Sequence, residues 1–129
     1  MHGITVSAFC SVSLTPPLIL VCIEKTTGSH YSLNDSGTFA VNILSAEQDI
    51  ISERFSIPFG NKFDGVEIRE GINGIPVLAD ALVSLECRLQ HAYDGGDHTI
   101  FVGLVEEVSI TDGSPLVYFH GNYRHLLET

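Results

Sequence analysis

Positive charge is scarce in this chain, which carries 6 Lys and Arg residues against 16 Asp and Glu residues, a formal net charge of −10. This balance argues against nucleic acid as a partner, because binding to a phosphate backbone depends on clustered Lys and Arg. An anionic nucleotide would have to be held by backbone amides, hydroxyls and a few well-placed cations. Long apolar runs are absent too, and no charged segment precedes an apolar one at the N-terminus. We therefore expect no membrane partner and no signal peptide.

Cysteines and metal-ligand patterns are equally sparse. The three cysteines, Cys10, Cys22 and Cys87, each lie inside an apolar strand pattern, and their odd number and spacing fit no zinc site. This placement predicts buried free thiols in a reducing compartment, which indicates a cytoplasmic protein. The six histidines are scattered, with no two spaced for a metal site on one element. We therefore expect no bound metal.

The most informative feature that is present is a period-two alternation over residues 4–14. One face is apolar and comprises Ile4, Val6, Ala8, Cys10, Val12 and Leu14, whereas the other comprises Thr5, Ser7, Phe9, Ser11 and Ser13. The alternation predicts a β-strand with one face in a core. Four hydroxyls and one ring suit a bound, polar, flat ligand, because Ser and Thr donate and accept without bringing charge. An edge strand with small polar residues facing water explains the composition equally well.

The next segments alternate between strands and short helices. Thr15-Pro16-Pro17 ends the first strand, and residues 18–23 predict a buried strand. Thr26 or Thr27 can cap a helix that runs to about Ser36 and stops at Gly37, before a strand over residues 38–44. Ser45 and Gln48 fit a capping box that opens a second helix, whose buried stripe would be Ile50, Ile51 and Phe55. Residues 57–65 predict a mobile loop.

The second half of the chain predicts mostly β structure. We expect a turn region over residues 71–76, strands over residues 81–92 and 99–111, and a turn between these strands over residues 93–98. Residues 112–114 predict a hairpin turn before a strand over residues 116–119. With 129 residues, 44% of them hydrophobic, the chain predicts one globular domain over residues 1–129. Many strands joined by tight turns favour a closed or nearly closed barrel, and no Gly-x-Gly-x-x-Gly follows a strand to indicate a Rossmann unit.

An ordered set of short motifs resembles the flavin reductase-like family, which has the flavin-binding split-barrel fold. The matching residues span nearly the whole chain in the family's order: 3–9, 11–13, 16–18, 27–30, 39–44, 95–101, 116–119, Gly121 and Tyr123. The resemblance implies a mainly β, flavin reductase-like split β-barrel with short peripheral helices. Members usually carry a helix and a first strand before the motif that begins here at Gly3. Either this is a natural short form, or an upstream start or a piece of the chain is missing.

The resemblance gives the stretch from Lys25 to Ser29 a second interpretation. Lys25, Thr26, Thr27 and Ser29 bring hydroxyls, amides and an ammonium to a strand-to-helix junction, which is compatible with a phosphate but equally with simple helix capping. In the family this position indicates the flavin phosphate, and His30 follows at a position that the family often fills with His. The flavin itself is expected along the first strand, with these candidate contacts: Thr5, Val6, Ser7, Ala8, Phe9 and Ser11.

The turn Gly96-Asp97-His98 is the second candidate site. Asp97 can hydrogen-bond one nitrogen of His98 and fix its tautomer, and in the family the motif lies near flavin and nicotinamide. We expect His98 to position the nicotinamide and to be no essential acid or base. Further candidates are Arg54, Lys62 and Phe63 beside the loop over residues 57–65, and Tyr123 near the C-terminus. We expect His2, His91, His120 and His125 to be structural or solvent residues.

The resemblance implies an NAD(P)H:flavin oxidoreductase that reduces FMN or FAD with NADH or NADPH as co-substrate. The reduced flavin would go to a partner flavin-dependent monooxygenase or react with oxygen. Two alternatives stay open: a flavin-binding carrier or redox sensor without reductase activity, and a structural domain that kept the fold and lost the ligand. We also expect a homodimer, because a small barrel leaves apolar surface and edge strands to cover.

Overall fold

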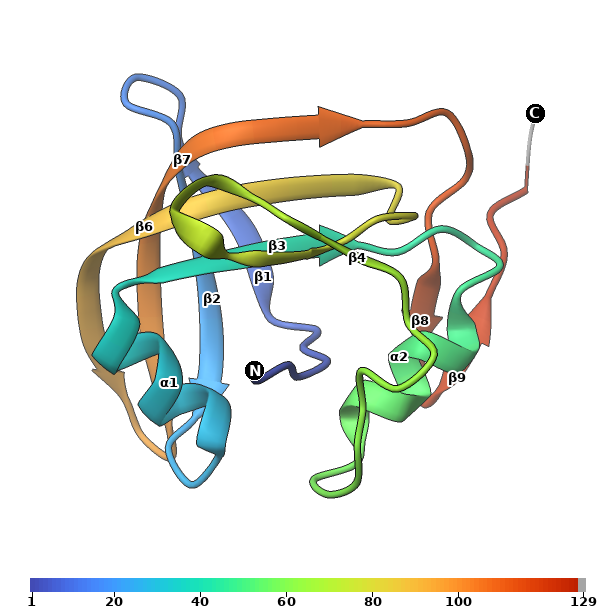
Figure 1. The fold of residues 1–129 in the computed structure, drawn as a ribbon, viewed down its shortest axis with the longest axis horizontal. Coiled ribbons are helices and arrows are strands. Elements are labelled where there is room, and N and C mark those ends of the chain that lie inside the picture. The colour runs from blue at the N-terminus through green and yellow to red at the C-terminus, as the bar shows by residue number, and fades with distance from the viewer. Residues whose placement is uncertain (128–129) are drawn as a thin grey trace.

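One strongly curved antiparallel sheet dominates the computed structural model, which describes residues 1–127. Its strand order is β1-β2-β7-β6-β3, and the bounds are β1 (Phe9–Ser13), β2 (Leu18–Glu24), β3 (Thr38–Ile43), β6 (Val83–Gly95) and β7 (His98–Ile110) (Figure 1). The ladder ends at β1 and β3, which do not pair with each other, so hydrogen bonds do not close the barrel. The mainly β class predicted from the sequence is therefore confirmed.

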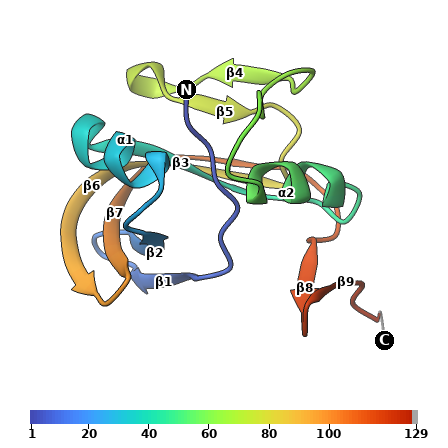
Figure 2. The ribbon, with the colours of Figure 1, turned by 90° about the horizontal axis from the view of Figure 1, so that it is seen from below.

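The core lies against the side of the sheet on which β2 places every second residue. Ile19, Val21 and Ile23 are buried there, and Phe101 of β7 and Leu33 join the same cluster. Figure 2 shows the sheet curling so that β1 and β2 lie on one side of the molecule and β3 on the other. The N-terminal segment crosses the open side of this curl on its way to β1 (Figure 2).

The first predicted helix is confirmed almost residue for residue as α1 (Gly28–Ser36). Thr27 is its N-cap, and the Thr27 hydroxyl accepts a hydrogen bond from the His30 amide at 3.2 Å. Gly37 ends the helix at φ 70°, a left-handed conformation that glycine adopts without cost. The helix therefore begins and ends where the capping residues predict.

The second helix, α2 (Asp49–Ser56), begins three residues later than the capping box at Ser45 predicts. The Gln48 side chain does accept a hydrogen bond from the Ser45 amide at 2.8 Å, but this closes a turn before the helix. The predicted buried stripe is wrong at Ile50, which is 67% exposed, whereas Ser52 and Phe55 are buried. The apolar pattern alone did not identify the buried face.

The predicted strand over residues 4–14 is shorter, and its faces are reversed within Phe9–Ser13, whereas Ile4 and Val6 pack against the core as predicted. Only Phe9–Ser13 pairs with β2, and Phe9 packs against the core while Cys10 is exposed. The prediction of three buried thiols is therefore wrong for Cys10. Residues before Phe9 are irregular because their contacts go elsewhere: the Thr5 amide donates to the Phe55 carbonyl at 3.1 Å, at the end of α2.

The pairing predicted for the strand over residues 116–119 is also wrong. Strand β8 (Val117–Phe119) pairs with β9 (Asn122–Arg124), not with β7. The segment before β8 instead bonds to the end of β3, where the Leu116 amide donates to the Leu44 carbonyl at 2.9 Å. Figure 1 shows β8 and β9 next to α2, away from the main sheet.

Two short strands that the sequence analysis did not anticipate flank the predicted turn region. β4 (Ile68–Glu70) and β5 (Pro76–Leu78) form a small hairpin through the short helix η1 (Ile72–Gly74). Glu86 of β6 holds this turn: its carboxylate is 2% exposed, accepts from the Ile72 amide at 2.6 Å and lies 3.6 Å from the Arg69 guanidinium. No helix in the part of the chain that the structure describes is long and apolar enough to cross a membrane.

Candidate functional site

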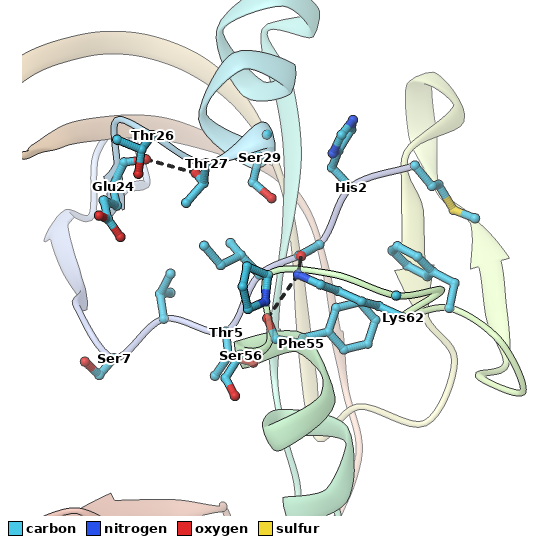
Figure 3. A pocket seen from close by; sticks show the side chains of 18 of the residues that line it. His2, Thr5, Ser7, Glu24, Thr26, Thr27, Ser29, Phe55, Ser56 and Lys62 are labelled. Carbon is cyan, nitrogen blue, oxygen red and sulfur yellow. Dashed lines mark hydrogen bonds between the residues drawn. The ribbon is translucent and has the colours of Figure 1, made fainter.

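A cavity of about 810 Å³ opens between three parts of the chain that are distant in sequence. One wall is the irregular N-terminal segment, one is the end of β2 with the start of α1, and one is the loop that follows α2 (Figure 3). His98, the first residue of β7, lies in the wall as well. The curl of the sheet thus brings residues near positions 5, 27, 60 and 98 to one place.

The α1 wall presents the beginning of a helix. The Thr27 hydroxyl is engaged there, because it donates to the Glu24 carbonyl at 2.9 Å as well as accepting from the His30 amide. Thr26 and Ser29 also line the cavity, and the first turn of α1 contains no acidic residue. The unpaired amides of this turn and its positive dipole end favour an anionic group.

Lys25 does not join this wall, contrary to the expected convergence of an ammonium with the hydroxyls. Its Nζ binds the Asp94 carboxylate at the end of β6. The hydrogen bond from Lys25 and its charge lower the pKa of Asp94 below the usual value. This solvent-exposed ion pair fastens the β2 end to the β6–β7 hairpin and removes Lys25 from the cavity lining.

The cation that does line the cavity is Lys62. Its Nζ donates to the Gly3 carbonyl at 3.1 Å and to the Phe55 carbonyl at 3.4 Å (Figure 3). No ion pair joins Lys62 to a carboxylate among residues 1–127. Gly3 is packed so closely that a Cβ there would lie 2.6 Å from the Phe55 ring. Lys62 therefore binds the N-terminal wall to α2 and keeps its positive charge at the cavity.

His98 is oriented by its neighbour in the tight β6–β7 turn. The Asp97 carboxylate lies 2.7 Å from His98 Nδ1, as the sequence predicts, and the hydrogen bond from His98 and its charge lower the pKa of Asp97. Gly96 adopts φ 79°, which lets the two strands join through only two residues. The bond at Nδ1 fixes the ring and leaves Nε2 for a ligand.

The predicted site residues divide into two groups. Ten of them line the cavity: Thr5, Val6, Ser7, Ala8, Thr26, Thr27, Ser29, Lys62, Phe63 and His98. The other seven do not: Phe9, Ser11, Lys25, His30, Arg54, Asp97 and Tyr123. Phe63 contacts Phe55 edge-on at 5.0 Å between ring centroids, on the wall opposite α1.

The residues outside the lining have other partners. His30 Nε2 lies 2.8 Å from the Thr99 hydroxyl, Arg54 donates to the Asp64 carbonyl at 2.7 Å, and the Tyr123 hydroxyl donates to Ser52 Oγ at 2.8 Å. Phe9 packs on the core, and Ser11 is exposed on β1. The side chains of His30, Arg54 and Tyr123 are thus bound to other parts of the protein, and Phe9 belongs to the core. Asp97 acts on the cavity through His98.

The cavity also contains residues that the sequence analysis did not select: Met1, His2, Gly3, Ile4, Cys22, Glu24, Phe55, Ser56, Pro58, Gly60 and Asn61. His2, expected to be a structural or solvent residue, lies against Gly28 at the start of α1. Glu24 can be found from the sequence, because it ends β2 directly before the predicted phosphate turn. Nothing local in the sequence marks Ser56 or Asn61.

The family model of the flavin reductase like domain matches residues 1–127. The chain belongs to this family. The prediction from the ordered motifs is therefore confirmed. Among curated proteins of the family, the chain is 40% identical to "FMN reductase (NADH) SmoA" of Agrobacterium fabrum over 94% of its own length and 69% of that protein. It is 41% identical to the reductase component of a 4-hydroxyphenylacetate 3-monooxygenase from Thermus thermophilus, over 98% of its length and 80% of that protein.

The solved structures of the family agree in fold. The NADH:FAD oxidoreductase SgcE6 of Streptomyces globisporus superposes with a TM-score of 0.93 at 36% identity, covering 98% of this chain and 79% of that one. The same oxidoreductase is also known in complex with NAD and FAD fragments. The chain therefore shares its architecture with a flavin reductase over nearly its whole length.

Proposed function

We propose that this protein is an NADH-dependent flavin reductase that supplies reduced flavin to a monooxygenase. The single observation that carries the proposal is the cavity of about 810 Å³, in which a helix N-terminus, Lys62 and an oriented His98 meet. Its relatives of 36–41% identity include NADH-dependent flavin reductases and reductase components of monooxygenases. Flavin here is FMN or FAD, and it acts as a substrate that leaves or as a bound cofactor.

The residues present fit a flavin nucleotide. The cavity volume lies in the range of sites for ligands of this size, and the amides at the start of α1 are free of acidic neighbours in their turn. Lys62 adds a positive charge from the opposite wall. Flavin and nicotinamide supply the hydride chemistry themselves when they are bound.

The protein's own contribution is therefore binding and orientation. Thr26, Ser29 and the α1 amides hold a phosphate, while the Thr5–Ala8 segment and Phe63 line the space for the ring system. His98, held by Asp97, aligns the nicotinamide from the β6–β7 turn. Correct alignment of two reactants replaces a costly encounter by a step within one complex.

An anaerobic titration tests the proposal. FMN is added to the purified protein, binding is followed by quenching of flavin fluorescence, and NADH is then added while flavin and NADH absorbance are recorded. A reductase bleaches the flavin bands and oxidises NADH in equal amounts. Binding without bleaching would support the carrier or sensor alternative, and absence of binding both of FMN and, in a second titration, of FAD would overturn every flavin function.

A homodimer is the second part of the proposal, and an apolar sheet face supports it. Across the ladder, Cys10 lies beside Leu20, Leu20 beside Val102, and Val102 beside His91. The next row on the same face joins Cys22, Ile100 and Tyr93, and neither row contains a charged residue. Cys10 is exposed and Tyr93 is 52% exposed, as suits a face that a second copy covers. Because Cys22 also lines the cavity, this face continues into the site.

A further inference from the structure

The first part of the loop that follows α2 is held by few contacts. Residues 57–60 form this part, which we call the flap. Among the hydrogen bonds of residues 1–127, one reaches the flap, from the Ile57 amide to the Arg54 carbonyl at 3.3 Å, where α2 ends. Apart from its chain neighbours, Gly60 has no heavy atom within 4 Å of the place that a Cβ would take. The flap can therefore move without breaking packed contacts, as ligand-binding loops commonly do.

The second part of the same loop is fastened on both sides. The Lys62 ammonium donates to the Gly3 and Phe55 carbonyls (Figure 3). The Asp64 carbonyl accepts a hydrogen bond from the Arg54 guanidinium at 2.7 Å. The flap thus lies between two fixed points, the end of α2 before it and Lys62 after it. A movement of the flap leaves the rest of the cavity wall in place.

The flap carries an aromatic side chain next to the cavity. Pro58 and Gly60 line the cavity, whereas Phe59 between them does not and is 76% exposed. No Phe or Tyr side chain among residues 1–127 is more exposed. Further along the loop, Phe63 lines the same wall and contacts Phe55 edge-on. A ring that is now in water therefore stands beside a wall that already presents an aromatic side chain to the cavity.

We propose that Phe59 closes onto the ring system of the bound flavin and sets part of the flavin affinity, an inference that rests on the proposed function. Aromatic side chains pack against flat aromatic rings in offset-stacked or edge-on arrangements, and the contact removes apolar surface of both partners from water. Loops that close over a bound substrate make such contacts only in the complex. The partner is the flavin, because the flap belongs to the same wall as Phe63, whereas His98 and the nicotinamide belong to the β6–β7 turn.

Calorimetric titrations with lumiflavin and with FMN test this contact, because lumiflavin has the ring system without the ribityl phosphate. Phe59→Ala should weaken the binding of both ligands by about two- to tenfold, the size of one aromatic contact. Phe119→Ala is the matched control, because Phe119 is 67% exposed on β8 and lies outside the cavity lining. The control should bind both ligands as the wild type does. Both variants should keep the wild-type unfolding midpoint in urea, since both rings are exposed.

Two further measurements distinguish a ligand contact from a structural role. In steady-state kinetics, Phe59→Ala should raise the KM for FMN by the same factor and leave the KM for NADH unchanged. Chymotrypsin, which cleaves after aromatic residues, should cut the free wild-type protein after Phe59. Saturating lumiflavin should slow this cut, because the closed flap is held against the ligand.

The inference on Phe59 can fail in four ways. Equal affinity of the wild type and Phe59→Ala for lumiflavin would overturn it, and so would the same loss in Phe119→Ala. A loss for FMN alone would overturn it because Phe59 would then act at the phosphate. Cleavage after Phe59 at the same rate with and without lumiflavin would contradict closure of the flap.

The proposed function is checked separately by the wild-type protein. If the wild type oxidises NADH with added flavin, any of these four results removes only the inference on Phe59. If the wild type binds flavin without reducing it, the reductase function fails, and the lumiflavin titration still decides the contact. If the wild type binds neither FMN nor FAD, both proposals are wrong.

Discussion

Single side chains at this site are defined by partners far away in the sequence. Lys25 reaches Asp94, His30 reaches Thr99, and Tyr123 reaches Ser52, each across about 70 residues. Local chemistry made Lys25 a candidate for ligand contact and the family resemblance made His30 and Tyr123 candidates, but neither can reveal a competing partner of this kind. His98 was predictable because its partner, Asp97, is its neighbour in sequence.

Ser7 tests whether the flavin lies along the N-terminal wall. Ser7→Val should weaken FMN binding by about two- to tenfold, because it removes roughly one hydrogen bond of about 0.5–1.5 kcal/mol. The unfolding midpoint in urea should stay unchanged, since Ser7 is exposed and outside the sheet. Fluorescence titration with FMN measures the effect, and unchanged binding would exclude Ser7 from the flavin face.

A variant of His98 distinguishes a role in orienting the nicotinamide from a role in proton transfer. His98→Ala should leave FMN affinity nearly intact and raise the KM for NADH, or lower kcat, by a modest factor, because alignment of the nicotinamide is lost. An acid or base would instead contribute about 10²–10⁴-fold. The Asp97 carboxylate, whose pKa is lowered, stays ionised through mildly acidic pH, so the orientation of His98 should persist there. Steady-state kinetics from mildly acidic to mildly basic pH decide between the roles, and a large kcat loss with an abolished pH dependence would contradict orientation.

The alkylation rates of the three cysteines should reveal how buried each thiol is and where the flavin lies. Burial, helped by the charges of Glu106 and Glu86, raises the pKa of the Cys87 thiol to about 12. Cys87 should therefore resist alkylation in the folded protein, whereas Cys10, exposed in one copy, should react fast in a monomer and slowly in the proposed dimer. Cys22, in the cavity wall, should react slowly and become protected when FMN is added. Mass spectrometry of alkylated peptides checks this, and equal labelling of Cys22 with and without FMN would place the flavin elsewhere.

The raised pKa of the Cys87 thiol also makes the free energy of unfolding depend on pH. Its pKa in the fold lies above the value of 9.0 of an unperturbed thiol, so the fold retains a proton that the unfolded chain loses first. This contribution is fully present below about pH 9 and is lost as pH rises toward 12. The free energy of unfolding should therefore fall less steeply over that interval in Cys87→Ala than in the wild type. The slopes are compared, because the variant is less stable at every pH.

Among the elements, those with local capping or turn chemistry were predictable and those that depend on pairing were not. Thr27 and Gly37 gave the ends of α1, and the predicted turn over residues 93–98 contains the β6–β7 turn, which the structure narrows to Gly96 and Asp97. The partner of β8 depended on contacts between residues 44 and 116, which no local pattern contains. The face of β1 was wrong because the N-terminal segment bonds to α2 instead of extending the ladder.

Thr27→Ala tests whether the cap at the start of α1 stabilises the fold. Loss of the bonds to the His30 amide and the Glu24 carbonyl should lower the free energy of unfolding by about 1 kcal/mol. Thr26→Ala is the control, because Thr26 is exposed and makes no capping bond in the described chain. Urea denaturation measures both variants, and equal stability of the two would show that the cap contributes nothing.

At the scale of the whole molecule, the strongly acidic chain provides positive charge on two opposite walls of the cavity, at Lys62 and at the α1 amides. Arg69 and Arg88 are paired with Glu86 and Glu106 on the sheet, away from the cavity lining. The few cations and helix amides predicted from composition are thus the features that the site contains. What composition could not reveal is which of the six basic residues would reach it.

The last prediction tests the proposed homodimer, because a single copy leaves Cys10 and Tyr93 exposed to water. Cys10→Lys places a charge in the centre of that face and should convert the dimer to a monomer, because an unpaired charge is costly in an apolar interface. The variant should still fold, since Cys10 is exposed in one copy. Asn34→Lys on exposed α1 surface is the matched control and should stay dimeric.

Sedimentation at micromolar concentration measures the masses of both variants and of the wild type. A wild-type mass of one chain with flavin bound would refute the dimer, and a dimeric Cys10→Lys variant would move the interface to another surface. If the face next to Cys22 is the interface, FMN affinity should fall together with dimer mass in Cys10→Lys, because the second copy covers the rim of the cavity.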